Sequence, residues 1–247
     1  MILTIALREL RSMFLSPLAW SVLAVTQLTI AWSFFTRIDF FFSIQAQLTT
    51  LPNAPGVTDL VVMPTFETAG VILLMVTPLL TMRLISEERR NGSITLLLSS
   101  PISMTEIVLG KFIGIVMFML MFIFMISMMP LSLLAGAQLD MGKFAAGVFA
   151  LALLLAAFCS AGLYLSSLTE NPVVAAISTF GLLLLLWIIS SNTGDDTATL
   201  TQLSLLSHFS PMLRGLINTA DIVYFMLFIA TFLILTIRQM DSRRLQG

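Results

Sequence analysis

The chain has 247 residues, of which 58% are hydrophobic and only 10% are charged, with a formal net charge of −1. Soluble domains carry roughly 25% charged residues, so most of this surface is expected to face lipid rather than water. The charge balance excludes a large basic surface for nucleic acid, and the single cysteine and single histidine exclude an intramolecular disulfide and a multi-histidine metal site.

The N-terminal residues 1–16 have the pattern of a short helix that lies along a membrane surface. Apolar residues recur at helical spacing, and three charged residues interrupt them. A frayed cytoplasmic tail is the alternative interpretation. Pro17 then permits a new helix to begin. The charge-free stretch that follows predicts a first membrane span at residues 17–36.

Five further charge-poor stretches predict five more membrane spans, because each has about the 20 residues that cross a bilayer as a helix. Residues 37–63 contain Pro, Asn and Gly and are predicted to form a loop, with a short helix at residues 40–48. The predicted fold class is all-α. The chain is expected to be a polytopic membrane protein with one transmembrane domain over residues 1–247, which includes an N-terminal interfacial helix and a cytoplasmic coupling helix. The further spans are at residues 66–84, 112–136, 144–168, 172–190 and 221–238.

Four residues in or beside these spans are candidates for a transport path or gate. Glu67 is expected near a helix start, where the helix dipole favours a carboxylate; a buried functional carboxylate is the alternative. Thr77 and Pro78 lie inside the second span, and the proline predicts a bend because it removes a backbone hydrogen bond. Asp221 opens the sixth span. The span interiors lack Asp, Glu, Lys, Arg and His, which argues against an ion-coupled carrier.

The remaining chemical patterns favour structural roles. The 16 methionines offer thioethers for Cu(I), but their spacing in the third span wraps round the helix and is typical of apolar filler. His208 lies in a predicted outer loop, either as a pH sensor or as a polar residue bonded to the backbone. No motif for ATP hydrolysis or serine hydrolysis is present, so the chain is expected to be no enzyme, with no cofactor or metal of its own.

The distribution of basic residues predicts the orientation in the membrane. Six spans place both termini on one side, together with residues 85–111, which we call the charged segment. These regions hold nine of the twelve Lys and Arg residues. Because loops rich in Lys and Arg stay in the cytoplasm, both termini and the charged segment are predicted to be cytoplasmic. The three on the opposite side are Arg37, Lys143 and Arg214.

Turn and capping signals divide the charged segment. Gly92 permits a sharp turn, Ser93 is a cap for a short helix, and Pro101 ends that helix. Ser103 and Glu106 form a capping box that opens the next helix. The short helix is expected to press its apolar residues into lipid headgroups or a partner protein. These residues are Ile94, Leu96, Leu97 and Leu98.

The same segment resembles the first cytoplasmic loop of the ABC-2 type permeases, the membrane subunits of ATP-driven exporters. The resemblance is carried by the run Glu88-x-x-x-Gly92-Ser93-x-x-x-Leu97-Leu98-x-x-Pro101, followed by Gly110-Lys111. The six-span layout agrees with it across the whole chain. A second run, from His208 to Phe225, resembles the closing segment of the gliding-motility GldF-like and NosY-like permeases.

The resemblance implies partners. A coupling helix within residues 94–100 would dock on a separate ABC ATP-binding subunit, present in two copies, which would bind ATP and magnesium. A second permease copy would complete a homodimer. A GldG-like auxiliary membrane protein with a large periplasmic domain would accompany it in the gliding-type systems. Glu87 and Glu88 are expected to hold the loop against the interfacial helix through Arg8 or Arg11.

The function expected from this resemblance is that of a permease subunit in a bacterial inner membrane. It would convert the ATP-driven motion of its partner into export or mechanical work. The alternative is a non-transporting membrane anchor of a motility or secretion complex. Both functions require a partner on the charged segment, and only the first requires substrate-stimulated ATP hydrolysis.

Overall fold

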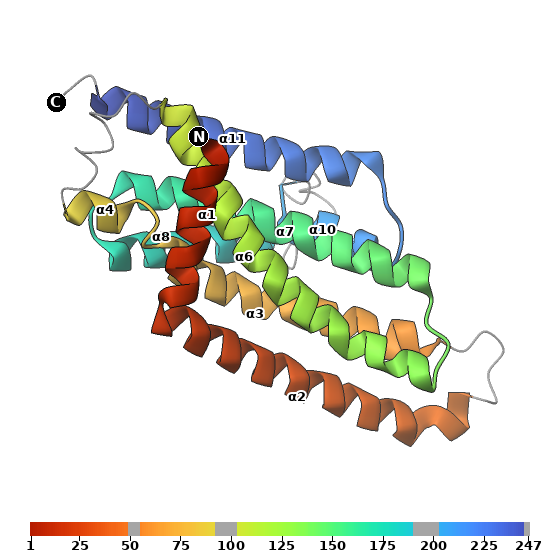
Figure 1. Ribbon diagram of the computed structural model, residues 1–247. Helices are drawn as coiled ribbons and strands as arrows, with labels where there is room; N and C mark the ends of the chain where they lie inside the picture. The colour runs from red at the N-terminus through yellow and green to blue at the C-terminus, as the bar shows by residue number, and fades with distance from the viewer. Residues whose placement is uncertain (49–54, 92–102, 190–202, 245–247) are drawn as a thin grey trace.

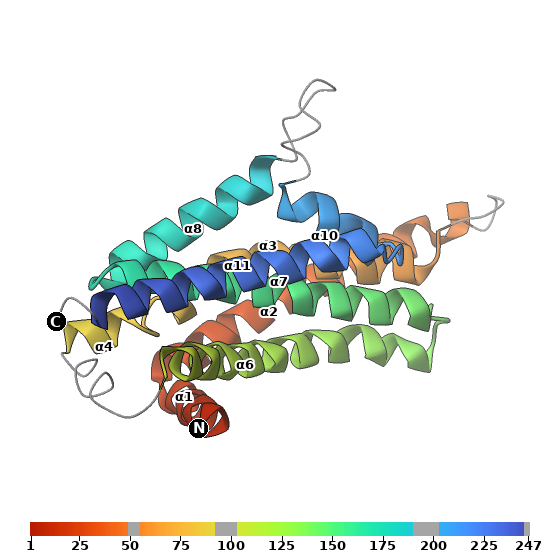
Figure 2. The same cartoon turned by 90° about the horizontal axis from the view of Figure 1, so that it is seen from above.

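The computed structural model describes residues 1–48, 55–91, 103–189 and 203–244. Within these ranges the chain is helical and has no strand, which confirms the all-α prediction. Long helices run side by side along one direction, and the first helix begins toward the same end of the bundle at which the last helix ends (Figures 1 and 2). We call this the α4 end, after the short helix α4 (Ser86–Arg90), and the opposite one the η1 end, after the helical turn η1 (Thr58–Val62).

Over the described residues, five helical stretches are long and apolar enough to cross a membrane, and α8 is a shorter apolar helix of 17 residues. In chain order the elements are α1 (Ile2–Leu15), α2 (Pro17–Leu48), η1 (Thr58–Val62), α3 (Met63–Thr81), α4 (Ser86–Arg90), α6 (Met104–Ser132), η2 (Leu133–Ala135), α7 (Met141–Leu168), α8 (Pro172–Ile188), α10 (Leu205–Leu213) and α11 (Thr219–Arg244).

The helix α2 is longer than the sequence predicts. It continues without a break from Pro17 to Leu48, so the predicted span at residues 17–36 and the short helix at 40–48 are one helix of 32 residues. Arg37 does not end it, because its Nη2 donates a hydrogen bond of 2.8 Å to Thr68 Oγ1 on α3. At 1.5 Å per residue α2 measures about 48 Å, longer than a hydrocarbon core of about 30 Å.

The helix α7 forms the centre of the bundle and contacts α3, α6, α8, α10 and α11. Its packing against α3 depends on Gly162. A Cβ at this position would lie 2.7 Å from Thr81 Cβ, closer than carbon atoms approach one another. Thr81 is fully buried, and its hydroxyl donates 2.9 Å to the Thr77 carbonyl. Because a β-branched side chain is stiff at χ1, Thr81 cannot move aside.

Gly162→Ala is therefore expected to separate α3 from α7 and to lower the free energy of unfolding by about 1–3 kcal/mol, as overpacking does. Gly181→Ala on α8 is the matched control, since no atom lies within 4 Å of the added Cβ. It should leave stability unchanged or raise it by up to about 1 kcal/mol. Thermal unfolding in detergent measures both. Equal midpoints for the two variants would contradict this account of the contact.

Candidate functional site

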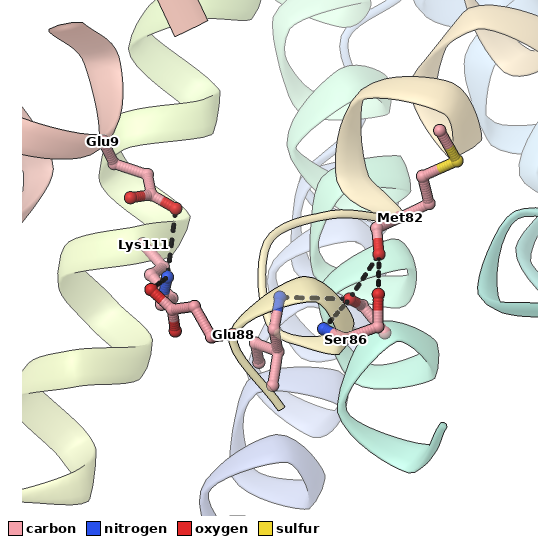
Figure 3. Close-up of polar contacts among 7 residues, drawn as sticks. Glu9, Met82, Ser86, Glu88 and Lys111 are labelled. Atoms are coloured by element: carbon pink, nitrogen blue, oxygen red, sulfur yellow. Dashed lines mark hydrogen bonds and ion pairs between the residues drawn. The ribbon is translucent and has the colours of Figure 1, made fainter. Parts of the chain in front are cut away.

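The residue at the centre of the site is Lys111 on α6, whose side chain is only 4% exposed. Its Nζ lies 3.0 Å from Glu9 Oε1 on α1 and 2.8 Å from Glu88 Oε1 on α4 (Figure 3). We call these three residues the Lys111 triad. One ammonium group therefore joins three helices at the α4 end.

The triad carries a formal charge of −1, because two carboxylates surround one ammonium. A buried ammonium without a partner costs several kcal/mol, so Lys111 requires its carboxylates. Glu9 and Glu88 are more exposed than the lysine, with side chains 17% and 22% accessible. Solvent therefore screens the excess negative charge while the ammonium stays enclosed.

Two glycines of α6 bring α1 into contact with the triad. A Cβ at Gly110 would lie 2.7 Å from Ile5 Cβ, and one at Gly114 would lie 2.9 Å from Glu9 Cβ. Spaced four residues apart, they occupy one face of the helix and let the two backbones approach closely. The crossing of α1 over this face brings the Glu9 carboxylate to Lys111 (Figure 1).

The turn that leads from α3 into α4 is held by Ser166 on α7. Its hydroxyl donates to the Met82 carbonyl at 3.0 Å and accepts from the backbone N–H groups of Ile85 and Ser86 at 3.2 Å each (Figure 3). One donated and two accepted bonds use the full capacity of a hydroxyl. Ser166 and Ser86 are fully buried. The start of α4 is therefore tied to the core of the bundle.

The end of α4 is held to the same helix by Arg89. Its Nη1 donates 2.7 Å to the Ser167 carbonyl, and its Nη2 lies 3.0 Å from Glu170 Oε1. The guanidinium side chain is 7% exposed, whereas Glu170 is 68% exposed. The short helix α4 thus bonds to α7 at two places and to α6 through Glu88.

The predicted capping box is present at the start of α6. The Glu106 N–H donates to Ser103 Oγ, and the Ser103 N–H donates to Glu106 Oε2, both at 3.2 Å. The helix therefore begins at Met104, earlier than the predicted span at residue 112. Seven of the eight predicted coupling residues lie outside the described residues: Gly92, Ser93, Ile94, Leu96, Leu97, Leu98 and Pro101.

The eighth predicted coupling residue, Glu88, is in place beside α1, but with a different partner. The sequence predicts that it pairs with Arg8 or Arg11, whereas its carboxylate binds Lys111. In the sequence, Lys111 stands out only as part of the Gly110-Lys111 pair that follows the ABC-2 motif. A lone lysine between Gly110 and Gly114 is the signal that could have identified it.

A cleft of about 380 Å³ separates α1 from α3 and α4. Buried apolar side chains of Ala19, Leu80 and Leu84 form part of its wall. Exposed Arg8 and Arg83 also line it, together with Glu9, Glu87 and Glu88 of the opposite charge. The cleft therefore offers apolar surface and charges of both signs to a segment of another protein.

The predicted path residues of α3 are part of its packing. Thr77 is fully buried, and its hydroxyl donates 2.6 Å to the Leu73 carbonyl of its own helix. Pro78 is buried as well, and α3 ends three residues later at Thr81. The predicted change of direction after the proline thus takes the form of the turn between α3 and α4.

Both interpretations of Glu67 are wrong. The helical stretch begins with η1 at Thr58, so Glu67 lies well beyond the first turn, where the helix dipole acts. Asp59 holds the first-turn position instead. Glu67 is also exposed and is not a buried carboxylate.

Asp221 and His208 form a pair at the start of α11. Asp221 Oδ1 lies 2.6 Å from His208 Nδ1 on α10, and the imidazole stacks on Tyr224 at 4.1 Å between ring centres. The Asp221 side chain is 9% exposed. His208 lies on the short helix α10, within the region predicted to connect the fifth and sixth spans. The sequence gives no direct signal of this pair, because the turn after α10 brings the two residues together.

Comparison with known protein families gives one match. A family model described as "ABC-2 family transporter protein" matches residues 3–230, from α1 into α11. Among curated proteins no match was found. The narrower resemblance to GldF-like and NosY-like permeases stays a prediction.

Lys111→Met should leave Glu9 and Glu88 facing each other without a cation. Removing one partner of a buried ion pair costs about 3–5 kcal/mol, and the partial exposure of the carboxylates places this variant near the lower value. Lys143→Met is the matched control: it breaks a half-exposed pair with Asp59, whose attraction is weakened by solvent screening. Chemical denaturation in detergent compares the two. If Lys111→Met were as stable as Lys143→Met, the Lys111 triad would not be a major contributor to the stability of the bundle.

Ser166→Ala should release the turn before α4, because the N–H groups of Ile85 and Ser86 lose their acceptor at a cost of about 1–3 kcal/mol. The amides of both residues should exchange with deuterium faster. Ser160→Ala on the same helix is the control, since this buried hydroxyl donates only within α7, to the Ala157 carbonyl. Unchanged exchange at Ile85 and Ser86 would refute the role of Ser166.

Proposed function

Because the chain belongs to the ABC-2 family of transporter proteins and is a multi-pass membrane permease of that family, we propose that a separate ABC ATP-binding subunit docks at the α4 end of its bundle. The permease then converts ATP-driven motion of that subunit into export or mechanical work. The chain contributes no catalytic group, and ATP and magnesium are bound by the partner.

The observation that carries this proposal is the Lys111 triad. Within the charged segment, α4 ends at Arg90 and α6 begins at Met104. A force applied to this segment reaches both helices, and Lys111 links them to each other and to α1. The bonds of Arg89 and Ser166 carry a displacement of α4 into α7. The apolar residues of the segment remain the proposed contact with the ATPase.

The cleft beside α1 supports the same docking site. The cleft has two exposed arginines, Arg8 and Arg83, together with carboxylates, so it suits a partner helix that carries both acidic and basic residues. The apolar wall of the cleft suits an apolar side chain of that helix. A segment seated there would touch α1 and α4 together. Docking at this position would therefore restrain two of the three helices that the Lys111 triad connects.

The orientation and the assembly belong to the same proposal. The α4 end faces the cytoplasm of a bacterial inner membrane, with both termini on that side, in agreement with nine of the twelve basic residues. Two permease copies and two ATP-binding subunits form the complex. A GldG-like auxiliary protein with a large periplasmic domain is the further proposed partner on the opposite side.

Ser12→Trp should fill the cleft and exclude the ATP-binding subunit. A steric cost above about 1.4 kcal/mol weakens binding at least tenfold, so less ATPase should co-purify in mild detergent. Thr4→Trp is the control, because it adds the same side chain to an exposed position of α1 outside the cleft. The subunit that co-purifies with the wild-type permease serves as the probe. Equal recovery with both variants would place the docking surface elsewhere.

A further inference from the structure

The η1 end of the bundle has a cavity of its own, on the far side from the proposed ATPase site. It has a volume of about 310 Å³ and lies between η1, α3 and the end of α10. Its charged residues are Asp59, Glu67 and Arg214, and Ser210 adds a hydroxyl. The buried side chains of Met63 and Leu213 supply apolar wall.

Of the three charged residues that line this cavity, only Asp59 forms an ion pair within the described chain. Asp59 is neutralised by Lys143, whose Nζ lies 2.6 Å from Asp59 Oδ1. Glu67 and Arg214 line the same cavity without forming an ion pair with each other. Neither side chain has a hydrogen bond or ion pair to any residue in the described part of the chain. One carboxylate and one guanidinium on different elements therefore remain available to a ligand.

The position of Arg214 is defined by the backbone. Arg214 caps α10, and its N–H bonds to the Pro211 carbonyl at 3.1 Å. Gly215 follows with φ +81°, a conformation that suits glycine, and a Cβ there would lie 3.1 Å from Lys143 Cγ. The turn thus packs on α7 and presents the arginine beside the cavity, opposite a carboxylate on the continuous helix of η1 and α3.

We propose that this cavity binds a zwitterionic group, with its cationic nitrogen at the Glu67 carboxylate and its phosphate or carboxylate at the Arg214 guanidinium. A guanidinium forms paired hydrogen bonds with phosphate and carboxylate, and an ammonium donates to a carboxylate. A ligand with one charge would satisfy only one of the two side chains. The apolar wall accommodates the carbon atoms between the charged groups.

A phosphoethanolamine headgroup of a membrane lipid and a free zwitterion share this chemistry. The cavity lies at the η1 end of the apolar helices, where a bilayer with a hydrocarbon core of about 30 Å would place its lipid headgroups. The site is separate from the Lys111 triad, so its occupancy can be tested independently of ATPase docking.

The first experiment titrates the full-length protein in detergent with glycerophosphoethanolamine and measures binding by calorimetry. The zwitterion should bind, and Glu67→Gln and Arg214→Gln should each weaken it roughly tenfold through loss of a charge-assisted hydrogen bond. Asp39→Asn and Arg90→Gln remove exposed charges outside the cavity and should leave binding unchanged. Glycerol phosphate, which is only anionic, and ethanolamine, which is only cationic, should bind more weakly than the zwitterion.

The second experiment distinguishes the source of the zwitterion. The protein is placed in nanodiscs of phosphatidylethanolamine and phosphatidylglycerol, and retained lipid is identified by native mass spectrometry. Selective retention of phosphatidylethanolamine, lost in Glu67→Gln and Arg214→Gln, supports a lipid headgroup. Binding of the soluble zwitterion without lipid retention supports a free ligand. The proposal is overturned if neither form binds selectively, or if the cavity variants behave as their controls.

Discussion

The structure at the α4 end depends on one buried ammonium group. The Lys111 side chain is enclosed by protein, and carboxylates from α1 and α4 reach its ammonium from two sides, which offsets the cost of burying the charge. Glu9 reaches it because Gly110 and Gly114 allow α1 to lie against α6 without intervening side chains. The relative positions of three helices are therefore set by two features of α6: a buried ammonium that requires carboxylate partners, and two glycines that let α1 approach.

The position of the short helix α4 is fixed by hydrogen bonds and ion pairs to its neighbours, and not by the intrinsic stability of the helix. Five residues cannot form a stable isolated helix in water, because helix nucleation is costly. Ser166 and Arg89 connect α4 to α7, and Glu88 connects it to α6. The helix α4, which lies within the charged segment, cannot shift without straining bonds to two long helices. In an ABC-2 permease, this restraint suits the proposed transfer of motion.

The two ends of the bundle differ in how their charges are used. At the α4 end the triad and Arg89 hold helices together, whereas at the η1 end the Asp59–Lys143 pair leaves Glu67 and Arg214 without a protein partner in the described chain. His208 and Asp221 form a third arrangement, a pair between α10 and α11. The helix segments between the two ends are apolar, so the charged residues of the two ends lie apart from each other.

The sequence by itself determined the membrane class, the helical fold and the family, because these depend on local patterns: charge-free runs, the restart at Pro17, the Ser103–Glu106 box and the Glu88–Pro101 motif. Tertiary structure decided which charges pair. Glu9 and Lys111 are 102 positions apart, and no local spacing indicates their contact. Arg37 was expected to end a span, yet Thr68 on a neighbouring helix lets α2 continue past it. Glu67 lies beyond the first turn of its helical stretch, and not in that turn as expected from the sequence, because η1 extends the helix before it. Local periodicity specifies a helix, but the partner of a polar side chain is fixed only when separate helices pack together.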